Sequence, residues 1–73
     1  LVEVHVHPDW VGQNISRMQE AARTPIPFLL RVGSGLVPHA DTIFQDGDLA
    51  YAACETDRVS DVETVLGSPP RRH

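Results

Sequence analysis

The strictest constraint on the fold is the alternation of apolar and polar residues at the start of the chain. In residues 1–7, valine occupies every even position, and glutamate or histidine occupies every odd position after the first. A period of two is typical of a strand in a sheet that has one covered face. Residues 1–7 are therefore predicted to form a strand, and the rest of the chain must supply the cover.

A helix and a strand follow in the predicted order of elements. Asn14 is the expected N-cap of a helix that runs to about Ala22, with Ile15, Met18 and Ala22 on one stripe. A second strand is expected over residues 26–32, with Pro27 at its start or at an edge of the sheet. The glycines in residues 33–35 predict a hairpin turn, and residues 36–37 a short return strand.

The second half of the chain predicts one more strand and one more helix. Asp46-Gly47 is a turn signal before a strand over residues 49–55, in which large and small residues alternate. Thr56 or Asp57 is the expected cap of a helix that reaches Leu66, with Ser60 and Glu63 as a capping box. Gly67 and the prolines after it end this helix.

The order β-α-β-β-β-α predicts an α+β fold, a small and mostly antiparallel sheet with both helices on one face. Seventy-three residues are enough for one domain. We expect this domain to span residues 1–67 and residues 68–73 to be a disordered tail.

The charge balance disfavours nucleic acid and anionic membranes as partners. The chain has ten carboxylates against six arginines and contains no lysine, so it offers no basic face to a phosphate backbone. Its single cysteine, Cys54, cannot form an internal disulfide and fits a reducing compartment. No apolar run is long enough to span a membrane, and no signal peptide is recognised.

Histidines provide the one pattern that could hold a metal ion. His5 and His7 are two positions apart in a predicted strand, so both point to one side, and a third ligand would have to come from His39, Asp41 or Cys54. A small metal-binding sensor or enzyme is therefore one alternative. No second pair of ligands with zinc spacing is present, and nothing pairs a nucleophile with a base, so we do not expect an enzyme.

Three segments together resemble the TrkA-C domain, which is the C-terminal domain of RCK proteins. They are VEV…WVGQNI at residues 2–15, FLLRVG…VP at residues 28–38, and DTI…DGDL at residues 41–49. The turn at Gly47-Asp48 is the most specific piece, whereas Gln13 stands where the family usually has lysine. The likeness covers about residues 1–67, and it is greatest to TrkA-type potassium uptake proteins of actinobacteria.

The resemblance implies a regulatory role. Domains of this family usually follow a domain that binds a nicotinamide or adenine nucleotide, so no cofactor is expected within this chain. The family implies a cytoplasmic homodimer within a larger ring that controls potassium transport through a membrane channel or transporter subunit, in some members with a small effector. We therefore expect a ligand-sensing and dimerisation domain of a Trk/Ktr-type gating subunit.

Four residues are expected near the dimer cleft, namely Ile15, Phe28, Leu30 and Pro38. Some family members bind cyclic di-AMP in this cleft, and of those contacts Ile15 and Pro38 match. The other contact positions carry Ser16, Gln19, Ala21 and Pro27-Phe28, which lose the polar contacts, and the arginine that would face the anion is gone. Cyclic di-AMP binding is therefore not expected, and the identity of the effector is left open.

One alternative keeps the same domain but changes the protein that carries it. A TrkA-C domain can be fused to a cation/proton antiporter or another exchanger, where it senses a cytoplasmic ligand. Only the sequence before Leu1 distinguishes this alternative from a separate gating subunit.

Overall fold

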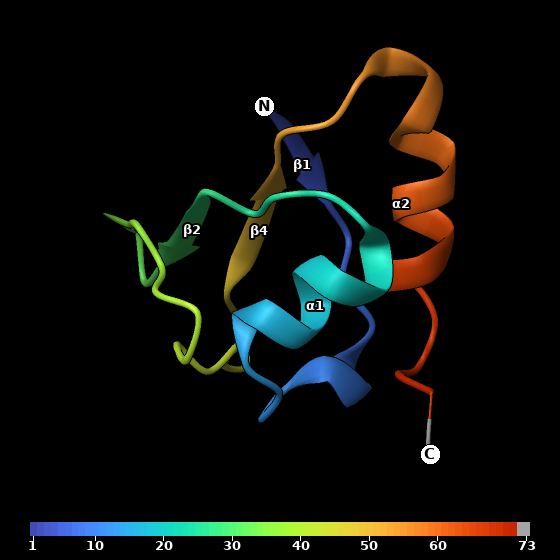
Figure 1. The fold of residues 1–73 in the computed structure, drawn as a ribbon. Helices are drawn as coiled ribbons and strands as arrows, with labels where there is room; N and C mark the ends of the chain where they lie inside the picture. The colour runs from blue at the N-terminus through green and yellow to red at the C-terminus, as the bar shows by residue number, and fades with distance from the viewer. Residues whose placement is uncertain (72–73) are drawn as a thin grey trace.

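The strands of the chain form one antiparallel sheet, whose arrangement is seen in the computed structural model of residues 1–71 (Figure 1). The strand order across the sheet is β1-β4-β2-β3, and every neighbouring pair is antiparallel. The strands are β1 (Val2–Val4), β2 (Phe28–Arg31), β3 (Ser34–Leu36) and β4 (Leu49–Ala52); the helices are α1 (Ile15–Ala22) and α2 (Val59–Leu66), with 3₁₀ turns η1 (Pro8–Trp10) and η2 (Thr56–Arg58). The predicted α+β class and the element order are confirmed.

Register gives the sheet one covered and one open face. Leu29 of β2 pairs with Ala50 of β4, and Val4 of β1 pairs with the same alanine, so the three side chains share a face. These residues are at most 2% exposed and join the buried residues of both helices in one core cluster. The opposite side, here called the open face, carries the outward residues Glu3, Phe28, Leu30, Gly35, Leu49 and Tyr51.

Helix α1 begins and ends as its sequence predicts. The side chain of Asn14 accepts a hydrogen bond from the backbone N–H of Arg17, which satisfies one of the free donors at the helix start. Ile15, Met18 and Ala22 are all buried on the predicted stripe. Arg23 then adopts the left-handed conformation that commonly ends a helix, with φ of 54°.

Helix α2 begins differently from the prediction. Its N-cap is Arg58, which makes no capping hydrogen bond with its side chain, and the expected capping box of Ser60 and Glu63 is wrong. The turn η2 instead feeds the chain directly into the helix. Gly67 ends it without a left-handed φ; a Cβ atom there would lie 2.6 Å from the carbonyl oxygen of Glu63, so glycine is required for space.

Several predicted boundaries are also wrong by a few residues. The first strand ends at Val4, because the chain then turns into η1 and the N–H of His7 donates to the carbonyl of Leu66. The hairpin turn lies at Val32-Gly33 and not at residues 33–35, because Arg31 pairs with Ser34. The return strand β3 therefore starts earlier than predicted, and β2 and β4 are shorter at their ends.

Candidate functional site

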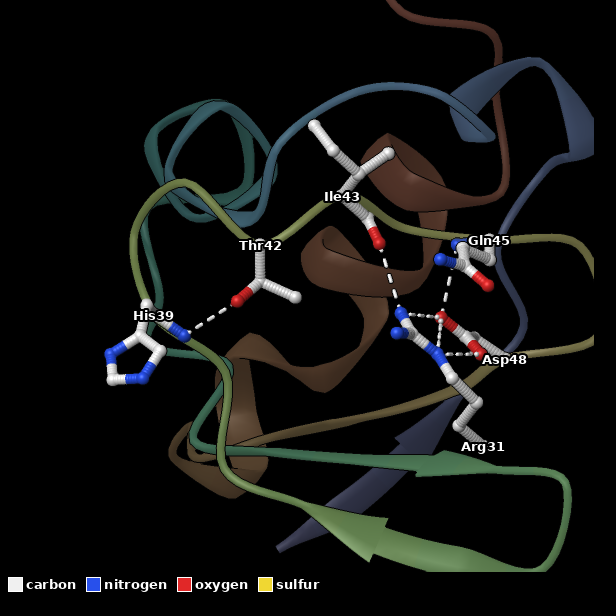
Figure 2. Close-up of polar contacts among 6 residues, drawn as sticks. All are labelled: Arg31, His39, Thr42, Ile43, Gln45 and Asp48. Atoms are coloured by element: carbon white, nitrogen blue, oxygen red, sulfur yellow. Dashed lines mark hydrogen bonds and ion pairs between the residues drawn. The ribbon is translucent and has the colours of Figure 1, made fainter.

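The long loop between β3 and β4 is held by an ion pair between the half-buried Arg31 and the buried Asp48 (Figure 2). Nη2 of Arg31 lies 2.7 Å from Oδ2 of Asp48, and Nε of the same arginine lies 2.9 Å from Oδ1, so two parallel hydrogen bonds join the groups. Nη2 also donates to the carbonyl oxygen of Ile43 at 2.9 Å. One arginine on β2 thus fixes both the middle and the end of the loop.

Asp48 is the more deeply buried partner, with 1% of its side chain exposed against 27% for Arg31. Burial alone would raise the pKa of the Asp48 carboxyl. The hydrogen bonds from Arg31 and from the N–H of Gln45, with the positive charge of Arg31, outweigh burial and hold this pKa below its ordinary value. The bond from the N–H of Gln45 is 2.9 Å long, so Asp48 also caps the turn that precedes β4.

The other end of the loop closes the start of α1. Oγ1 of Thr42 accepts from the N–H of His39, which holds a tight turn. The carbonyl of Thr42 then accepts from the N–H of Ile15, and the carbonyl of Ala40 accepts from the N–H of Ser16. Two of the free donors at the helix start are satisfied in this way. The motif from Asp41 to Asp48 therefore acts as a structural brace.

The open face of the sheet is apolar over most of its width. The rings of Phe28 and Tyr51 meet edge to face, with centroids 5.6 Å apart. Phe28 also lies over Gly35, where an added Cβ would come within 2.7 Å of its ring. The Tyr51 hydroxyl donates to Oε1 of Glu3 at 3.3 Å, and burial together with the charge of Glu3 raises the pKa of Tyr51. Glu3 is the only charged residue of the face as defined.

Exposed large apolar residues gather around this face. Leu49 belongs to it and is 37% exposed, and Val32 at the tip of the hairpin beside it is 97% exposed. Leu1 and Val37, which continue β1 and β3, are also mostly exposed. The open face and its rim therefore hold most of the large apolar surface that the described residues leave in water.

Two of the four predicted cleft residues lie on this face. Phe28 and Leu30 are both half-buried there. Pro38 lies half-buried in the loop after β3, and Ile15 is 1% exposed inside the core. The structure thus brings Phe28 and Leu30 together but does not place the Ile15 side chain at a surface.

Leu49 and Tyr51 were not singled out from the sequence, although they complete the open face. The signal was present in the alternation of large and small residues along residues 49–54. What the sequence lacked was the strand order, which places β4 between β1 and β2 and so sets these two side chains in the centre.

The three histidines of the metal alternative lie in different local settings. His5 and His39 are exposed, and Nδ1 of His7 accepts from the N–H of Asp9 as the cap of η1. Within residues 1–71, no three histidine, cysteine or carboxylate side chains are grouped as metal ligands would be. No helix in this same range has both the length and the apolar character needed to cross a bilayer.

The fold and these surfaces define a small α+β domain with a braced loop and an uncovered apolar sheet face. Comparison with known proteins then identifies a relative. The chain is 39% identical over 70 residues to the Trk system potassium uptake protein TrkA of Streptomyces coelicolor. The match covers 96% of this chain and 31% of the relative, so this chain spans about a third of that protein's length. The resemblance to a TrkA protein predicted from the sequence is confirmed.

The other two comparisons add no further relative. No model of a known protein family matches the chain. No solved structure matches it either.

Proposed function

We propose that this chain is a regulatory domain of a Trk/Ktr-type gating subunit that controls potassium transport. The observation that carries the proposal is the 39% identity to a TrkA protein over nearly the whole chain. In this role the domain is cytoplasmic and has no catalytic activity. It acts on a membrane potassium transporter or channel subunit, and the nucleotide is bound by another domain of the gating subunit.

We further propose that the domain pairs with a second copy of itself through the open face. A two-fold interface places each surface patch against the same patch of its partner, so a charged patch would meet its own charge. This chain has a net charge of −4, yet the open face bears Glu3 alone, near one side of the sheet in β1. The apolar centre formed by Phe28, Leu30, Leu49 and Tyr51 can therefore meet its copy without repulsion.

The regulatory role is tested by exchanging the matching segment. The third of the Streptomyces coelicolor protein that aligns with this chain is replaced by residues 1–73, and potassium uptake is measured in cells whose own TrkA has been deleted. Restored uptake at low external potassium is the expected result. Uptake no better than with the segment simply deleted would contradict the role. A matched exchange carrying Leu29→Ala, which damages the core, controls for folding of the inserted domain.

A further inference from the structure

A groove lies on the helix side of the molecule, away from the open face. Its volume is about 430 Å³, and it runs between the outer sides of α1 and α2. Trp10 of η1 lines it, as do Ser68, Pro69 and Arg71 of the segment that leaves α2. The segment after α2 is held back against η1 by a hydrogen bond of 2.7 Å from Nε1 of Trp10 to the carbonyl of Ser68. In Figure 1 this segment runs from the end of α2 toward the label C.

Arg17 is the unusual residue of the groove. Its Nη2 donates to the main-chain oxygen of Arg71, while its Nε is buried and has no hydrogen-bond partner among residues 1–71. Residues 1–71 contain two ion pairs, and neither of them includes Arg17. Buried N–H groups in proteins are almost always paired. The Nε and Nη2 groups of an arginine form a fork that fits the two oxygens of one anion.

We propose that this groove binds a small organic anion, with Arg17 donating from Nε and Nη2 to two oxygens of the ligand. The main-chain oxygen of Arg71 takes the place of one of these oxygens in the structure. A charged oxygen accepts a stronger hydrogen bond from a guanidinium than a neutral carbonyl does, so the ligand replaces this one hydrogen bond to Arg71, while the bond from Trp10 to Ser68 keeps the segment in place as a wall of the groove. The Arg71 side chain, which also lines the groove, adds a second positive charge.

The remaining walls restrict the ligand further. Glu20 lines the groove and disfavours a second negative charge, so we expect a monoanion such as a carboxylate or a phosphodiester. Ala21, Val65 and Pro69 offer apolar contacts to the body of the ligand. The hydroxyls of Thr64 and Ser68 already donate to main-chain oxygens and are not free to donate to the anion.

Trp10 makes the site measurable, because it is the only tryptophan of the chain. Tryptophan fluorescence of the whole chain is recorded while benzoate, as the carboxylate probe, or diphenyl phosphate, as the phosphodiester probe, is added. We expect a saturable change with at least one of them. Acetate, which lacks the apolar body, and benzyl alcohol, which lacks the charge, are expected to bind about ten-fold more weakly or worse.

The variant Arg17→Gln removes the charge and is expected to weaken binding by about ten-fold or more. Arg17→Lys keeps the charge but loses the fork, so its affinity for the probe is expected to lie between that of the unchanged chain and that of Arg17→Gln. Arg23→Gln is the matched control, because this exposed arginine ends the same helix but does not line the groove. The melting temperature of each variant without ligand shows that it is folded.

Two results would overturn the groove proposal. The first is that neither benzoate nor diphenyl phosphate causes a saturable change in fluorescence. The second is that a folded Arg17→Gln variant binds the probe as tightly as the unchanged chain. The interpretation of the groove as an effector site rests on the proposed regulatory function, whereas binding itself does not. If the chain binds a probe but fails to restore potassium uptake, the groove proposal stands and the proposed regulatory function is wrong. If the chain restores uptake but binds neither probe, the regulatory function stands and the groove proposal is wrong.

Discussion

The two faces of the sheet use side chains of opposite size. On the covered face, β4 presents Ala50 and Ala52, which are at most 1% exposed beneath the helix layer. On the open face, the same strand presents Leu49 and Tyr51, which no other element of residues 1–71 covers completely. Small side chains let the helices approach the sheet closely, while large ones facing outward leave apolar area in water.

The difference assigns a separate role to each face. Side chains on the covered face hold the domain together, and those on the open face are free to contact a partner. The two neighbours Leu29 and Leu30 are the sharpest comparison, since they lie in one strand but on opposite faces. Changes on the covered face should therefore alter the free energy of unfolding, and changes on the open face should alter self-association.

The largest expected effect is that of Leu29→Ala. Leu29 is fully buried, so the change leaves a cavity and lowers the free energy of unfolding by about 2–5 kcal/mol. Leu30→Ala, at a half-buried position of the open face, should lower the free energy of unfolding by about 1 kcal/mol. Urea unfolding of the two variants at low protein concentration measures the difference. Equal losses would mean that both faces are packed alike and would contradict their separate roles.

The next largest loss of stability is expected at Arg31, which holds the loop between β3 and β4. Arg31→Met removes every hydrogen bond that this side chain donates to Asp48 and Ile43, and it leaves the carboxylate buried without its cation. We expect a loss of about 1–3 kcal/mol in the free energy of unfolding. Arg23→Met, at an exposed arginine, is the control and should cost little. If both variants unfold at the same urea concentration, the brace contributes nothing to stability.

The same ion pair predicts a dependence of stability on pH. The pKa of Asp48 is lowered in the folded state, so its contribution is complete above the unfolded pKa of about 3.9 and is lost as the pH falls through the folded pKa. The melting temperature of Asp48→Asn should therefore fall less steeply in acid than that of the unchanged chain. Asp46→Asn, in the exposed part of the same turn, controls for the loss of one carboxylate. Identical acid slopes for Asp48→Asn and the unchanged chain would refute this prediction.

The smallest effect is a gain in stability at the tip of the hairpin. Val32 is 97% exposed and has φ of 49°, a conformation that β-branched residues avoid. Asparagine followed by glycine suits this turn, so Val32→Asn should raise the free energy of unfolding by about 0.5–1 kcal/mol. Val37→Asn tests whether removing an exposed valine is enough, since Val37 is not a positive-φ residue. Stabilisation by both changes would show that backbone strain at Val32 is not the cause.

Local signals predicted most of the fold. Asn14 and the stripe of Ile15, Met18 and Ala22 fixed the first helix to the residue, because capping and periodicity act over one or two turns. The alternation of large and small residues predicted the last strand, which the structure has at Leu49–Ala52. The hairpin was placed wrongly because the glycines at 33 and 35 both resemble turn residues, and only pairing across the sheet decides between them.

The site was less predictable than the fold, because it depends on strand order. Phe28 and Leu30 were expected at an interface, but their neighbours Leu49 and Tyr51 come from a strand nearly twenty residues later in the chain. The role of Asp48 as a partner of Arg31 also joins two elements that are distant in sequence. Nothing in the local pattern around Arg17 indicated the groove, which forms only when the segment after α2 returns to η1.

The most direct test of the role of the open face is the molecular mass of the chain in solution. Sedimentation equilibrium at high micromolar concentration compares the unchanged chain with Leu30→Glu, which places a charge in the centre of the open face. We predict a dimer for the unchanged chain. For the variant we predict a monomer that still unfolds cooperatively, with a melting temperature lower by only several degrees. A monomeric unchanged chain, or a variant that dimerises equally well, would contradict the assignment of the open face to self-association.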